Sequence, residues 1–573
     1  MRIKITIIVL ISLMASACSA LIPGRNVLPD VISPGGTIYY IRPDGGDTQQ
    51  CNGQADIPYS GSGQDQACAW DHPFRALPPG GPARIEGGDT LIIASGSYRL
   101  GYGAPGAESP ALCNPDNPWD CRMSPVPAGP DPQHPTLILG EGWNTGCPTP
   151  PEVWGAERAS RLFDLTRTSN AVIACLELTD HATCADGHPN SDLSCQRGSF
   201  PYGEWASVGL YAEDSENIWL RDLNIHGLAS AGIHAGRLAD WRIENTRLAG
   251  NGWVGWYGDL WQGSDSNSGT LKFSHWLVEW NGCVESFPDE QPTGCWAQPA
   301  RGYGDGVGTG ETGGHWIIED SAFLHNTSDG LDLLYGNHNI KIEIRRSRAE
   351  GNAGNQIKTR GVATIENTIV VGNCAFFMGK PFTASGDFNG DGQIESAVED
   401  CRAFGNALSF DLWRGNRITV TNASITGQGD CLVIAQCSEG EKCEGNERVI
   451  MRNDLFIGQP DFTNPSEASC LSYSEDLSAA TFEVDYSLIF GVKEDVCPGN
   501  QSICGKDPQI LISDLSNFTP KPLKTSPLID AAHRLNCPAT DINGHIRPQG
   551  GGCDIGAIEF LFENLYYLPL VGK

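Results

Sequence analysis

The sequence predicts an all-β protein, a single right-handed parallel β-helix with inserted loops and capped ends. From about residue 216, a phrase of alternating apolar and polar residues recurs at intervals of 21–26 residues, with two longer intervals of 35 and 40. The short intervals match one turn of a β-solenoid, and the long ones indicate turns that carry an insertion. The chain is also rich in glycine (69) and proline (37), and no long run has helical periodicity. This composition suits many short strands and turns.

The amino terminus predicts export. Two basic residues precede an apolar stretch over 5–14, which is too short for a transmembrane helix and fits a secretory signal. The following "ASAC" resembles a bacterial lipobox, which makes 1–17 a signal peptide of the lipoprotein type and Cys18 the lipidated residue. Ordinary cleavage after Ala17 or Ala20 is the alternative.

The cysteines predict disulfides. The chain has 21 cysteines, an odd count, and lipidation of Cys18 would leave 20 that can all pair. They show no zinc-type spacing, so disulfides in an oxidising compartment are expected, with a connectivity that the sequence leaves open. Several pairs are close in sequence: Cys51/Cys68, Cys113/Cys121, Cys184/Cys195, Cys283/Cys295, Cys437/Cys443, Cys497/Cys504 and Cys537/Cys553.

Two regions are expected before the regular solenoid. Residues 18–36 are interpreted as a linker, and 37–200 as an N-terminal cap and first solenoid turns with disulfide-linked loops. The stretches "YYIRPDGGD" (39–47) and "HPFRAL" (72–77) look like the opening of many secreted β-helix proteins, where an early strand and a short helix cap the solenoid. A cap is needed because an open sheet end invites pairing with other chains.

The regular β-helix is expected over 201–535. In "NIKIEIRRS", Ile340, Ile342 and Ile344 share one face of a strand, and polar residues alternate with them on the other. A polar position of the phrase recurs at Arg221, Glu244, Glu279, Glu319, Arg345 and Glu366. An asparagine follows the phrase at Asn251, Asn281, Asn326, Asn352 and Asn373. Stacked turns would bring these amides close enough to hydrogen-bond along the stack.

The last region and the net charge bear on location and partners. Residues 536–573 resemble a terminal segment of surface-anchored bacterial β-helix proteins. The formal charge of −31 excludes nucleic acid and anionic membranes as partners, because long-range electrostatics would be repulsive. We therefore expect an extracytoplasmic monomer, secreted or at the bacterial cell surface, that touches a membrane only through a lipid on Cys18.

Three acids and a lysine recur at nearly one-turn intervals. Asp305, the pair Asp329 and Asp332, and Lys358 come from three successive turns, and each turn advances by only about 4.8 Å. They are therefore predicted to line one patch. Asp329 and Asp332 would point to opposite faces of a regular strand, so the chain is expected to bend between them at Gly330.

This patch predicts a calcium site and a base. Oxygen-only ligands favour a hard cation, Ca²⁺ before Mg²⁺. A lysine beside bound Ca²⁺ is expected to have a lowered pKa and to accept a proton from a carbon next to a metal-neutralised carboxylate. That is the chemistry of β-elimination in a uronic-acid polymer. As a residue on a strand surface, Lys358 is expected to tolerate alanine within about 0.5 kcal/mol of stability.

These residues carry a resemblance to a known family. "GDGVGTGETGGHWIIEDSAFLHNTSDGLDLL" followed by "RRSRAEGNAGNQIKTRG" resembles the core of family 9 polysaccharide lyases, which are pectate-lyase-like β-helices. The resemblance implies that Asp305, Asp329 and Asp332 are Ca²⁺ ligands and that Lys358 is the base. It departs at Ser328, where the family has the first aspartate of a pair, which implies weaker Ca²⁺ binding or a different substrate.

Two further groups are candidates for binding. A local basic group around Lys358 includes Arg345 and Arg360, which are interpreted as contacts for uronate carboxylates. Solvated strand edges are the alternative. In "DFNGDGQIE", alternate residues fit the start of a calcium loop, which predicts a structural Ca²⁺ site, although the loop does not end as an EF-hand does; these residues are Asp387, Asn389, Asp391 and Gln393.

Two other functions remain open from sequence. "NTSDGLD" is similar to a motif of polygalacturonases, which are glycoside hydrolases on the same fold, but the next turn offers Lys358 and no second acid pair. The third reading is a non-catalytic surface protein that uses the solenoid to bind carbohydrate or as a spacer, since the fold alone does not specify a function.

Overall fold

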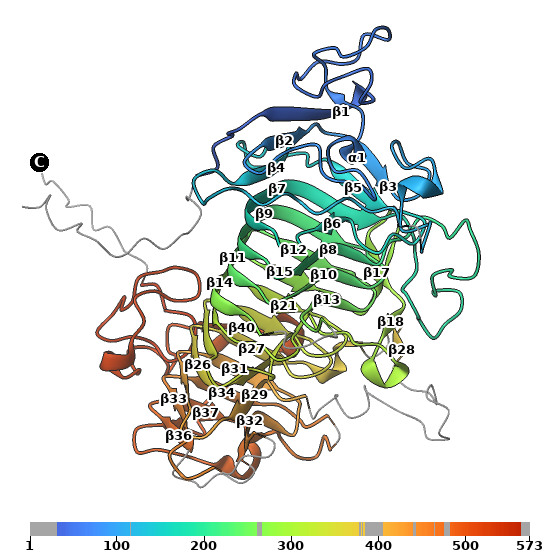
Figure 1. Ribbon diagram of the computed structural model, residues 1–573. Coiled ribbons are helices and arrows are strands. Elements are labelled where there is room, and N and C mark those ends of the chain that lie inside the picture. The colour runs from blue at the N-terminus through green and yellow to red at the C-terminus, as the bar shows by residue number, and fades with distance from the viewer. Residues whose placement is uncertain are drawn as a thin grey trace, which may run out of the picture.

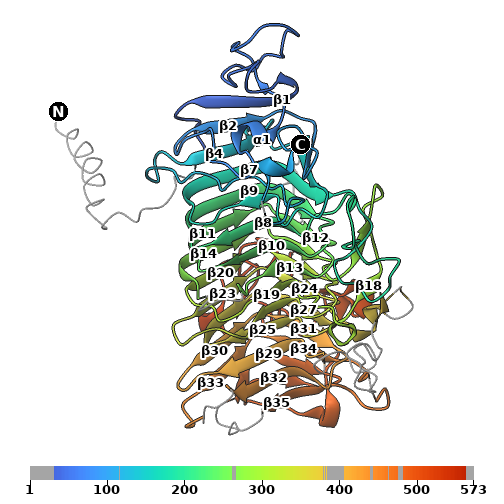
Figure 2. The ribbon, with the colours of Figure 1, turned by 45° about the vertical axis from the view of Figure 1, so that its right-hand side comes forward.

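A computed structural model describes residues 31–562, apart from 115, 261–265, 378–379, 381, 384–404, 439–442, 463 and 475–481. The signal peptide, Cys18 and the possible calcium loop at 387–395 lie outside the described residues. The described chain forms a right-handed parallel β-helix, as the sequence predicts, and its strands stack as successive rungs (Figure 1; Figure 2).

Three parallel stacks of strands form the solenoid, and two of them are joined into one 24-stranded sheet. The join exists because β7 (Ser169–Asp180) and β9 (Glu216–His226) each run through both stacks. The other strands of the first stack are β1 (Ile38–Gly46), β2 (Thr90–Ile93), β4 (Thr136–Gly140), β11 (Ala239–Glu244), β14 (Ser268–Ser274), β20 (His315–Glu319), β23 (Lys341–Arg345), β26 (Val362–Glu366), β30 (Arg417–Thr421), β33 (Arg448–Arg452) and β36 (Phe482–Asp485). Those of the second stack are β3 (Ser97–Leu100), β5 (Glu152–Gly155), β12 (Arg247–Ala249), β15 (Leu277–Glu279), β21 (Ala322–Leu324), β24 (Arg348–Glu350), β27 (Ile369–Gly372), β31 (Ser424–Gly427), β34 (Leu455–Gly458), β37 (Leu488–Phe490) and β38 (Ile503–Cys504).

The third stack is a separate ten-stranded sheet, which carries the candidate site. Its strands are β6 (Phe163–Asp164), β8 (Val208–Glu213), β10 (Ala231–Gly236), β13 (Val254–Tyr257), β19 (Val307–Gly308), β22 (Leu331–Leu333), β25 (Ile357–Arg360), β29 (Leu408–Leu412), β32 (Cys431–Cys437) and β35 (Cys470–Ser474). The remaining pairs lie in insertions and at the carboxyl end: β16 (Val284–Ser286) with β17 (Gln291–Thr293), β18 (Cys295–Trp296) with β28 (Phe382–Thr383), and β39 (Ile510–Ile512) with β40 (Thr519–Pro522).

Helical structure is scarce in the described part of the chain. The α-helix there is α1 (Pro73–Ala76), which lies near the N-terminal strands. The 3₁₀ helices are η1 (Pro110–Leu112), η2 (Gln298–Ala300), η3 (Cys374–Phe377), η5 (Lys493–Asp495), η6 (Leu515–Asn517) and η7 (Arg534–Asn536). Within the described residues, no helix is long and apolar enough to cross a bilayer.

A single left-handed residue turns the chain from the first stack to the second. Ten rungs carry such a residue, with φ between +47° and +62°. Asparagine and aspartate accept this conformation at low cost, and they supply six of the ten corners. The corner residues are Cys175, Asp222, Asn245, His275, Asp320, Arg346, Asn367, Asn422, Asn453 and Tyr486.

The predicted alternation within each strand is confirmed. Ile342 and Ile344 of β23 are buried, whereas Lys341, Glu343 and Arg345 between them face outward. Inside the solenoid, aromatic rings from successive turns stack, and the ring centroids of Phe273 and Trp316 lie 5.2 Å apart. The core is therefore continuous along the axis rather than divided among the turns.

The asparagine ladder is confirmed over four turns. Each side-chain Nδ2 donates to Oδ1 of the next residue at 2.8–2.9 Å, in the order Asn251, Asn281, Asn326 and Asn352. Asn352 then donates to Oε1 of Gln356 at 2.8 Å. The extension to Asn373 was wrong, because Asn352 donates to Gln356, four residues further along the same turn, and Nε2 of Gln356 donates back to the carbonyl of Asn352 at 3.0 Å.

One register prediction was wrong. Glu244 pairs with Ser274, and Ser274 pairs with Glu319, so the recurring polar position runs through Ser274 rather than Glu279. Glu279 lies in the second stack, opposite Ala249. The phrase "WLVEWNG" resembles the others, but it begins after the corner at His275, whereas the others begin before their corners. The insertion between β15 and β18 makes the intervals irregular, so the spacing does not reveal the difference.

The carboxyl-terminal segment packs along the side of the solenoid. Phe518, Leu528 and Ile555 form a second buried cluster with the outer faces of β27, β34 and β37. Corner asparagines bind this segment: Nδ2 of Asn422 donates to the carbonyl of Asp554 at 2.8 Å.

Nine disulfides join cysteines of the described residues, and they include all seven pairs that are close in sequence. The structure adds Cys147–Cys175 and Cys431–Cys470. So many disulfides fit a protein outside the reducing cytoplasm.

Candidate active site

The predicted acids and lysine meet on the third stack. Asp332 of β22 is in register with Lys358 of β25, and both align with Gly308 of β19. Asp329 lies just before β22 and Asp305 just before β19. One carboxylate oxygen from each of the three aspartates lies within 4.8 Å of the other two. We call these four residues (Asp305, Asp329, Asp332 and Lys358) the Asp–Lys cluster.

Backbone amides hold one oxygen of each carboxylate. The amide of Asp329 donates to Oδ1 of Asp305 at 2.9 Å, the amide of Asn355 to Oδ1 of Asp329 at 2.7 Å, and the amide of Leu334 to Oδ1 of Asp332 at 2.8 Å. The carboxylates are thus oriented before any ligand binds, which reduces the cost of ordering them.

The chain bend expected between Asp329 and Asp332 explains how both reach one side. Regular pairing in β22 begins only at Leu331, so Asp329 lies in the preceding loop. Its side chain is therefore not bound by the alternation of faces along a strand. A Cβ on Gly330 would lie 2.5 Å from Nδ2 of Asn352, so only glycine lets the loop approach the asparagine ladder this closely.

Lys358 bridges two of the acids. Its Nζ lies 3.0 Å from Oδ2 of Asp329 and 2.7 Å from Oδ2 of Asp332. Burial acts to lower the pKa of Lys358, but the charges of the three aspartates outweigh it and raise the pKa above its usual range. The pKa of Lys358 would therefore be lowered, as expected from sequence, only if a bound divalent cation offset the negative charges of the three aspartates. Burial has the opposite effect on a carboxyl group: it raises the pKa of Asp332, and the positive charge of Lys358 opposes this increase.

The cluster fits a hard divalent cation. Its donors are carboxylate oxygens alone, and their separation of at most 4.8 Å equals about twice a typical Ca²⁺–oxygen distance of roughly 2.4 Å. The three aspartates are each at most 7% exposed, and a single ammonium balances only one of their charges. A dication would balance the other two.

Tyr303 also belongs to this site, although sequence reasoning missed it. A Cβ on Gly308 would lie 2.6 Å from the Tyr303 hydroxyl and 2.8 Å from Oδ2 of Asp305, so both groups crowd this glycine. Burial and the negative charges of Asp305 and Asp332 raise the pKa of the Tyr303 phenol. The signal in the sequence was an aromatic residue two positions before Asp305 in "GYGDG".

Comparisons with known proteins give structural likenesses only, since no family model and no curated protein matches the chain. It is similar to the crystal structure of pectate lyase Pel9A, with 14% identity, a TM-score of 0.42, and coverage of 92% of this chain and 97% of that one. It is also similar to the catalytic unit of a GH87 α-1,3-glucanase from Streptomyces thermodiastaticus, with 10% identity, a TM-score of 0.29, and coverage of 70% and 63%. A PL6 family alginate lyase, AlyGC, is 11% identical, with a TM-score of 0.28 and coverage of 73% and 51%. Likenesses this weak assign no activity to the chain.

Arg360 lies on the same strand face as Lys358, two residues further along β25. Its guanidinium pairs with the buried carboxylate of Asp411. It also lies 4.9 Å from the ring centroid of Trp413 and 5.8 Å from that of Tyr335, whose side chain is exposed. These two aromatic residues, which the sequence reasoning did not single out, lie beside Arg360 on the same sheet as the Asp–Lys cluster.

The structure does not bring Arg345 to the cluster. It lies on β23 of the first stack, where it pairs with Glu319 at 3.0 Å and with Glu343. Arg346 pairs with Asp320 on the same side of the solenoid. The basic group around Lys358 is therefore a feature of sequence proximity, because consecutive strands of one turn belong to different sheets.

On the other side of the cluster, aromatic side chains continue the same strand position. Tyr211, His234 and Tyr257 are in register with one another, and Tyr257 is in register with Gly308. Their rings lie 4.8–5.2 Å apart from centroid to centroid. The Asp–Lys cluster thus follows a file of three aromatic residues at one strand position, and beyond Lys358 that position is taken by Ser409 and Ile434.

Proposed function

We propose that this protein is a polysaccharide lyase that cleaves a uronic-acid polymer by β-elimination, with Lys358 as the base. The observation that carries the proposal is the position of Lys358, whose Nζ lies within 3.0 Å of two buried carboxylates of the preceding turn. A lysine so placed could exchange a proton at a site whose three aspartates would hold a cation. The resemblance of the sequence around these residues to family 9 polysaccharide lyases supports the same reaction.

Asp305, Asp329 and Asp332 would hold Ca²⁺. Bound there, Ca²⁺ would neutralise the uronate carboxylate and make the proton on C5 more acidic. Neutral Lys358 accepts that proton, and the electron pair left on carbon forms the C4–C5 double bond as the C4–O bond breaks. The departing oxygen takes a proton from water. Arg360 is proposed as a contact for a neighbouring uronate carboxylate, because its guanidinium keeps donors beyond those that face Asp411.

The arrangement favours elimination over hydrolysis. A glycoside hydrolase keeps its two catalytic carboxyl groups roughly 5 to 9.5 Å apart, so that one donates a proton while the other acts as base or nucleophile. Here one carboxylate oxygen of each aspartate lies within 4.8 Å of the other two, and Lys358 bridges Asp329 and Asp332. This close grouping suits cation binding better than acid–base hydrolysis.

The direct test is ultraviolet absorbance of the unsaturated product. The purified chain would be incubated with a panel of uronic-acid polymers, with Ca²⁺ or with a chelator. We expect absorbance to rise on at least one polymer, and only with Ca²⁺. If no polymer yields unsaturated product but one still binds, the protein is a non-catalytic carbohydrate-binding solenoid, and Ser328 is where the site departs from active lyases.

We also propose that the mature protein is anchored at the cell surface through lipid on Cys18. The "ASAC" motif supports this, and so does the cysteine count, which becomes even once Cys18 is lipidated. The net charge of −31 would disfavour contact with anionic headgroups, so the lipid would be the sole attachment.

A further inference from the structure

A second polar cluster lies on the second stack and involves an inserted hairpin. The insertion after β15 is closed by the Cys283–Cys295 disulfide and contains the antiparallel strands β16 and β17. We call residues 283–295 the inserted hairpin. It carries Glu285 and Glu290 to the ends of β7 and β9, where Glu177 and His226 lie. None of these side chains belongs to the Asp–Lys cluster.

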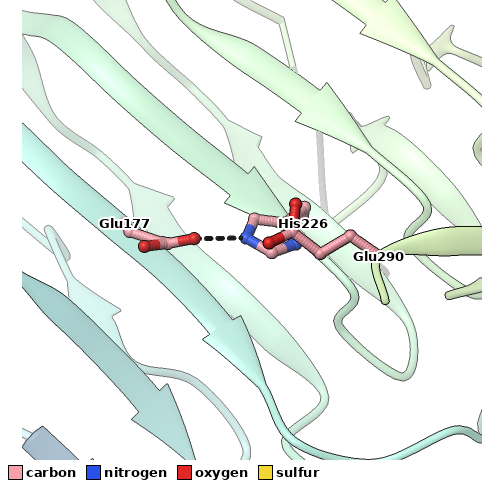
Figure 3. Close-up of side chains that lie close together, drawn as sticks. All are labelled: Glu177, His226 and Glu290. Carbon is pink, nitrogen blue, oxygen red and sulfur yellow. Dashed lines mark hydrogen bonds and ion pairs between the residues drawn. The ribbon is translucent and has the colours of Figure 1, made fainter. Parts of the chain in front are cut away.

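His226 is held on both ring nitrogens. Its Nε2 lies 2.9 Å from Oε1 of Glu177, and its Nδ1 lies 2.5 Å from Oε1 of Glu285. The ring is only 3% exposed and Glu285 only 7%. Figure 3 shows the carboxylate of Glu290 beside the same ring, arriving from the hairpin side.

Two glycines make room for Glu285. A Cβ on Gly250 would lie 2.6 Å from Oε2 of Glu285, and a Cβ on Gly227 would lie 3.0 Å from its Oε1. Both glycines also have positive φ, at +59° and +68°. The solenoid corners are thus shaped to receive this carboxylate, so its contact with His226 is built into the fold.

The cluster encloses a small acidic cavity of about 30 Å³. That volume exceeds the roughly 10–15 Å³ that a single water molecule requires, so the cavity has room for one ion. Five acidic side chains line it (Glu152, Glu177, Asp180, Glu285 and Glu290), and its described lining includes no lysine or arginine. A protonated His226 would balance only one of the carboxylates around it.

We propose that Glu177, His226 and Glu290 form a second cation site, which takes a transition-metal dication of the Zn²⁺ class. One ligand atom from each of the three lies within 4.8 Å of the others. An imidazole nitrogen among carboxylates selects Zn²⁺ and similar metals over Ca²⁺, which prefers oxygen alone. This separates the site chemically from the all-oxygen Asp–Lys cluster.

Glu285 is the positioning residue of this site. Metal-ligating histidines commonly donate their second ring N–H to a carboxylate, which fixes the tautomer and orients the ring. The 2.5 Å contact between Nδ1 of His226 and Glu285 has this arrangement and leaves Nε2 facing Glu177. The metal would join three segments, β7, β9 and the inserted hairpin, and so clamp the hairpin onto the solenoid.

The test is metal binding by the full-length mature chain, purified without a histidine tag and stripped with a chelator. Calorimetric titrations with Zn²⁺ and with Ca²⁺ would be run on wild type, Glu290→Gln and Asp332→Asn. Glu290 is exposed, so its replacement by the isosteric amide should leave the fold intact. We expect one tight Zn²⁺ equivalent in wild type and Asp332→Asn, and at least a tenfold weaker affinity in Glu290→Gln.

A second measurement tests the role of Glu285. Co²⁺ bound in place of Zn²⁺ should give a visible absorption band that Glu285→Gln shifts while the three ligands stay present. Equal Zn²⁺ affinity in wild type and Glu290→Gln, or no Zn²⁺ binding by wild type, would overturn the proposal and make His226 a buried ion-pair partner only. Loss of Zn²⁺ binding in Asp332→Asn alone would likewise overturn it, by assigning the metal to the Asp–Lys cluster.

Discussion

At the scale of single residues, Lys358 shows how burial changes an expectation drawn from sequence. It was expected to behave as a surface lysine, yet its side chain is only 13% exposed and contacts two buried carboxylates. Removing one partner of a buried ion pair leaves the other charge uncompensated and typically costs about 3–5 kcal/mol. The expected tolerance of alanine within about 0.5 kcal/mol is therefore replaced by a substantial loss of stability.

This difference makes Lys358→Arg the decisive variant for the base. Arginine keeps the positive charge against Asp329 and Asp332, but it stays protonated at neutral pH and cannot accept the proton. We expect Lys358→Arg to fold and to lose about 10²- to 10⁴-fold in the rate of unsaturated product formation. Circular dichroism would verify folding. A variant that cleaves at the wild-type rate would remove Lys358 from the mechanism.

His72 predicts an acid-sensitive cap. Its Nδ1 accepts the amide of Phe74 at the start of α1, and its Nε2 donates to the carbonyl of Arg99 at 2.9 Å. Burial lowers the pKa of His72 to about 4, although the contact with the Arg99 carbonyl opposes this. Because the folded state disfavours the proton that the unfolded state binds, the stability from neutral His72 is present above pH 6.5 and is lost as pH falls toward 4.

We expect this loss of unfolding free energy to reach about 3 kcal/mol at pH 4. In His72→Asn the amide oxygen can still cap α1, but nothing titrates there. The melting temperature should therefore fall less between pH 7 and pH 4.5 in His72→Asn than in wild type. His134→Asn, which replaces an exposed histidine, is the matched control and should follow wild type. Equal acid sensitivity of His72→Asn and wild type would contradict the prediction.

At the scale of elements, the asparagine ladder ties successive turns through their side chains. Asn326 occupies its middle: Oδ1 accepts from Asn281, and Nδ2 donates to Asn352 at 2.8 Å and to the carbonyl of Val278 at 3.2 Å. All these groups are buried, so a gap in the ladder leaves polar atoms without water or partner.

Asn326→Ala should lower the free energy of unfolding by about 2–5 kcal/mol, because at least two buried groups lose a partner. Asn339→Ala, at an exposed turn, should change it by less than about 0.5 kcal/mol. Denaturant titration of both variants would measure the difference. Similar midpoints for the two would mean that the ladder follows from the fold rather than stabilising it.

At the scale of the whole molecule, the many disulfides fit a protein outside the reducing cytoplasm. Among the described residues, eight of the nine disulfides close loops of fewer than 30 residues, so most of them link residues within an insertion or in neighbouring turns. The exception is Cys431–Cys470, which joins β32 to β35 over 39 residues.

Cys18→Ser tests the proposed anchor. A lipoprotein carries several acyl chains, which hold a protein firmly, whereas one chain binds only marginally. Expressed in bacteria, wild type should fractionate with membranes, and Cys18→Ser should be released into the soluble extracytoplasmic fraction. Unchanged fractionation of the variant would indicate another anchor, and a soluble wild type would indicate plain secretion.

The sequence by itself determined the features that depend on a constant turn length. Where the repeat is 21–26 residues, residues separated by that interval lie at the same position on successive turns. This regularity placed all four residues of the Asp–Lys cluster, and the step from Asn326 to Asn352 in the asparagine ladder. The buried isoleucines of β23 followed from the two-residue alternation within a strand.

Only the tertiary structure decided what depends on the path of insertions and corners. Insertions break the residue count, so the shift from Glu279 to Ser274 could not be read from spacing. Corners send neighbouring strands to different sheets, which separates Arg345 from Lys358. The His226 cluster joins β7, β9 and the inserted hairpin, whose contacts follow from side-chain packing and carry no periodic signal in the sequence.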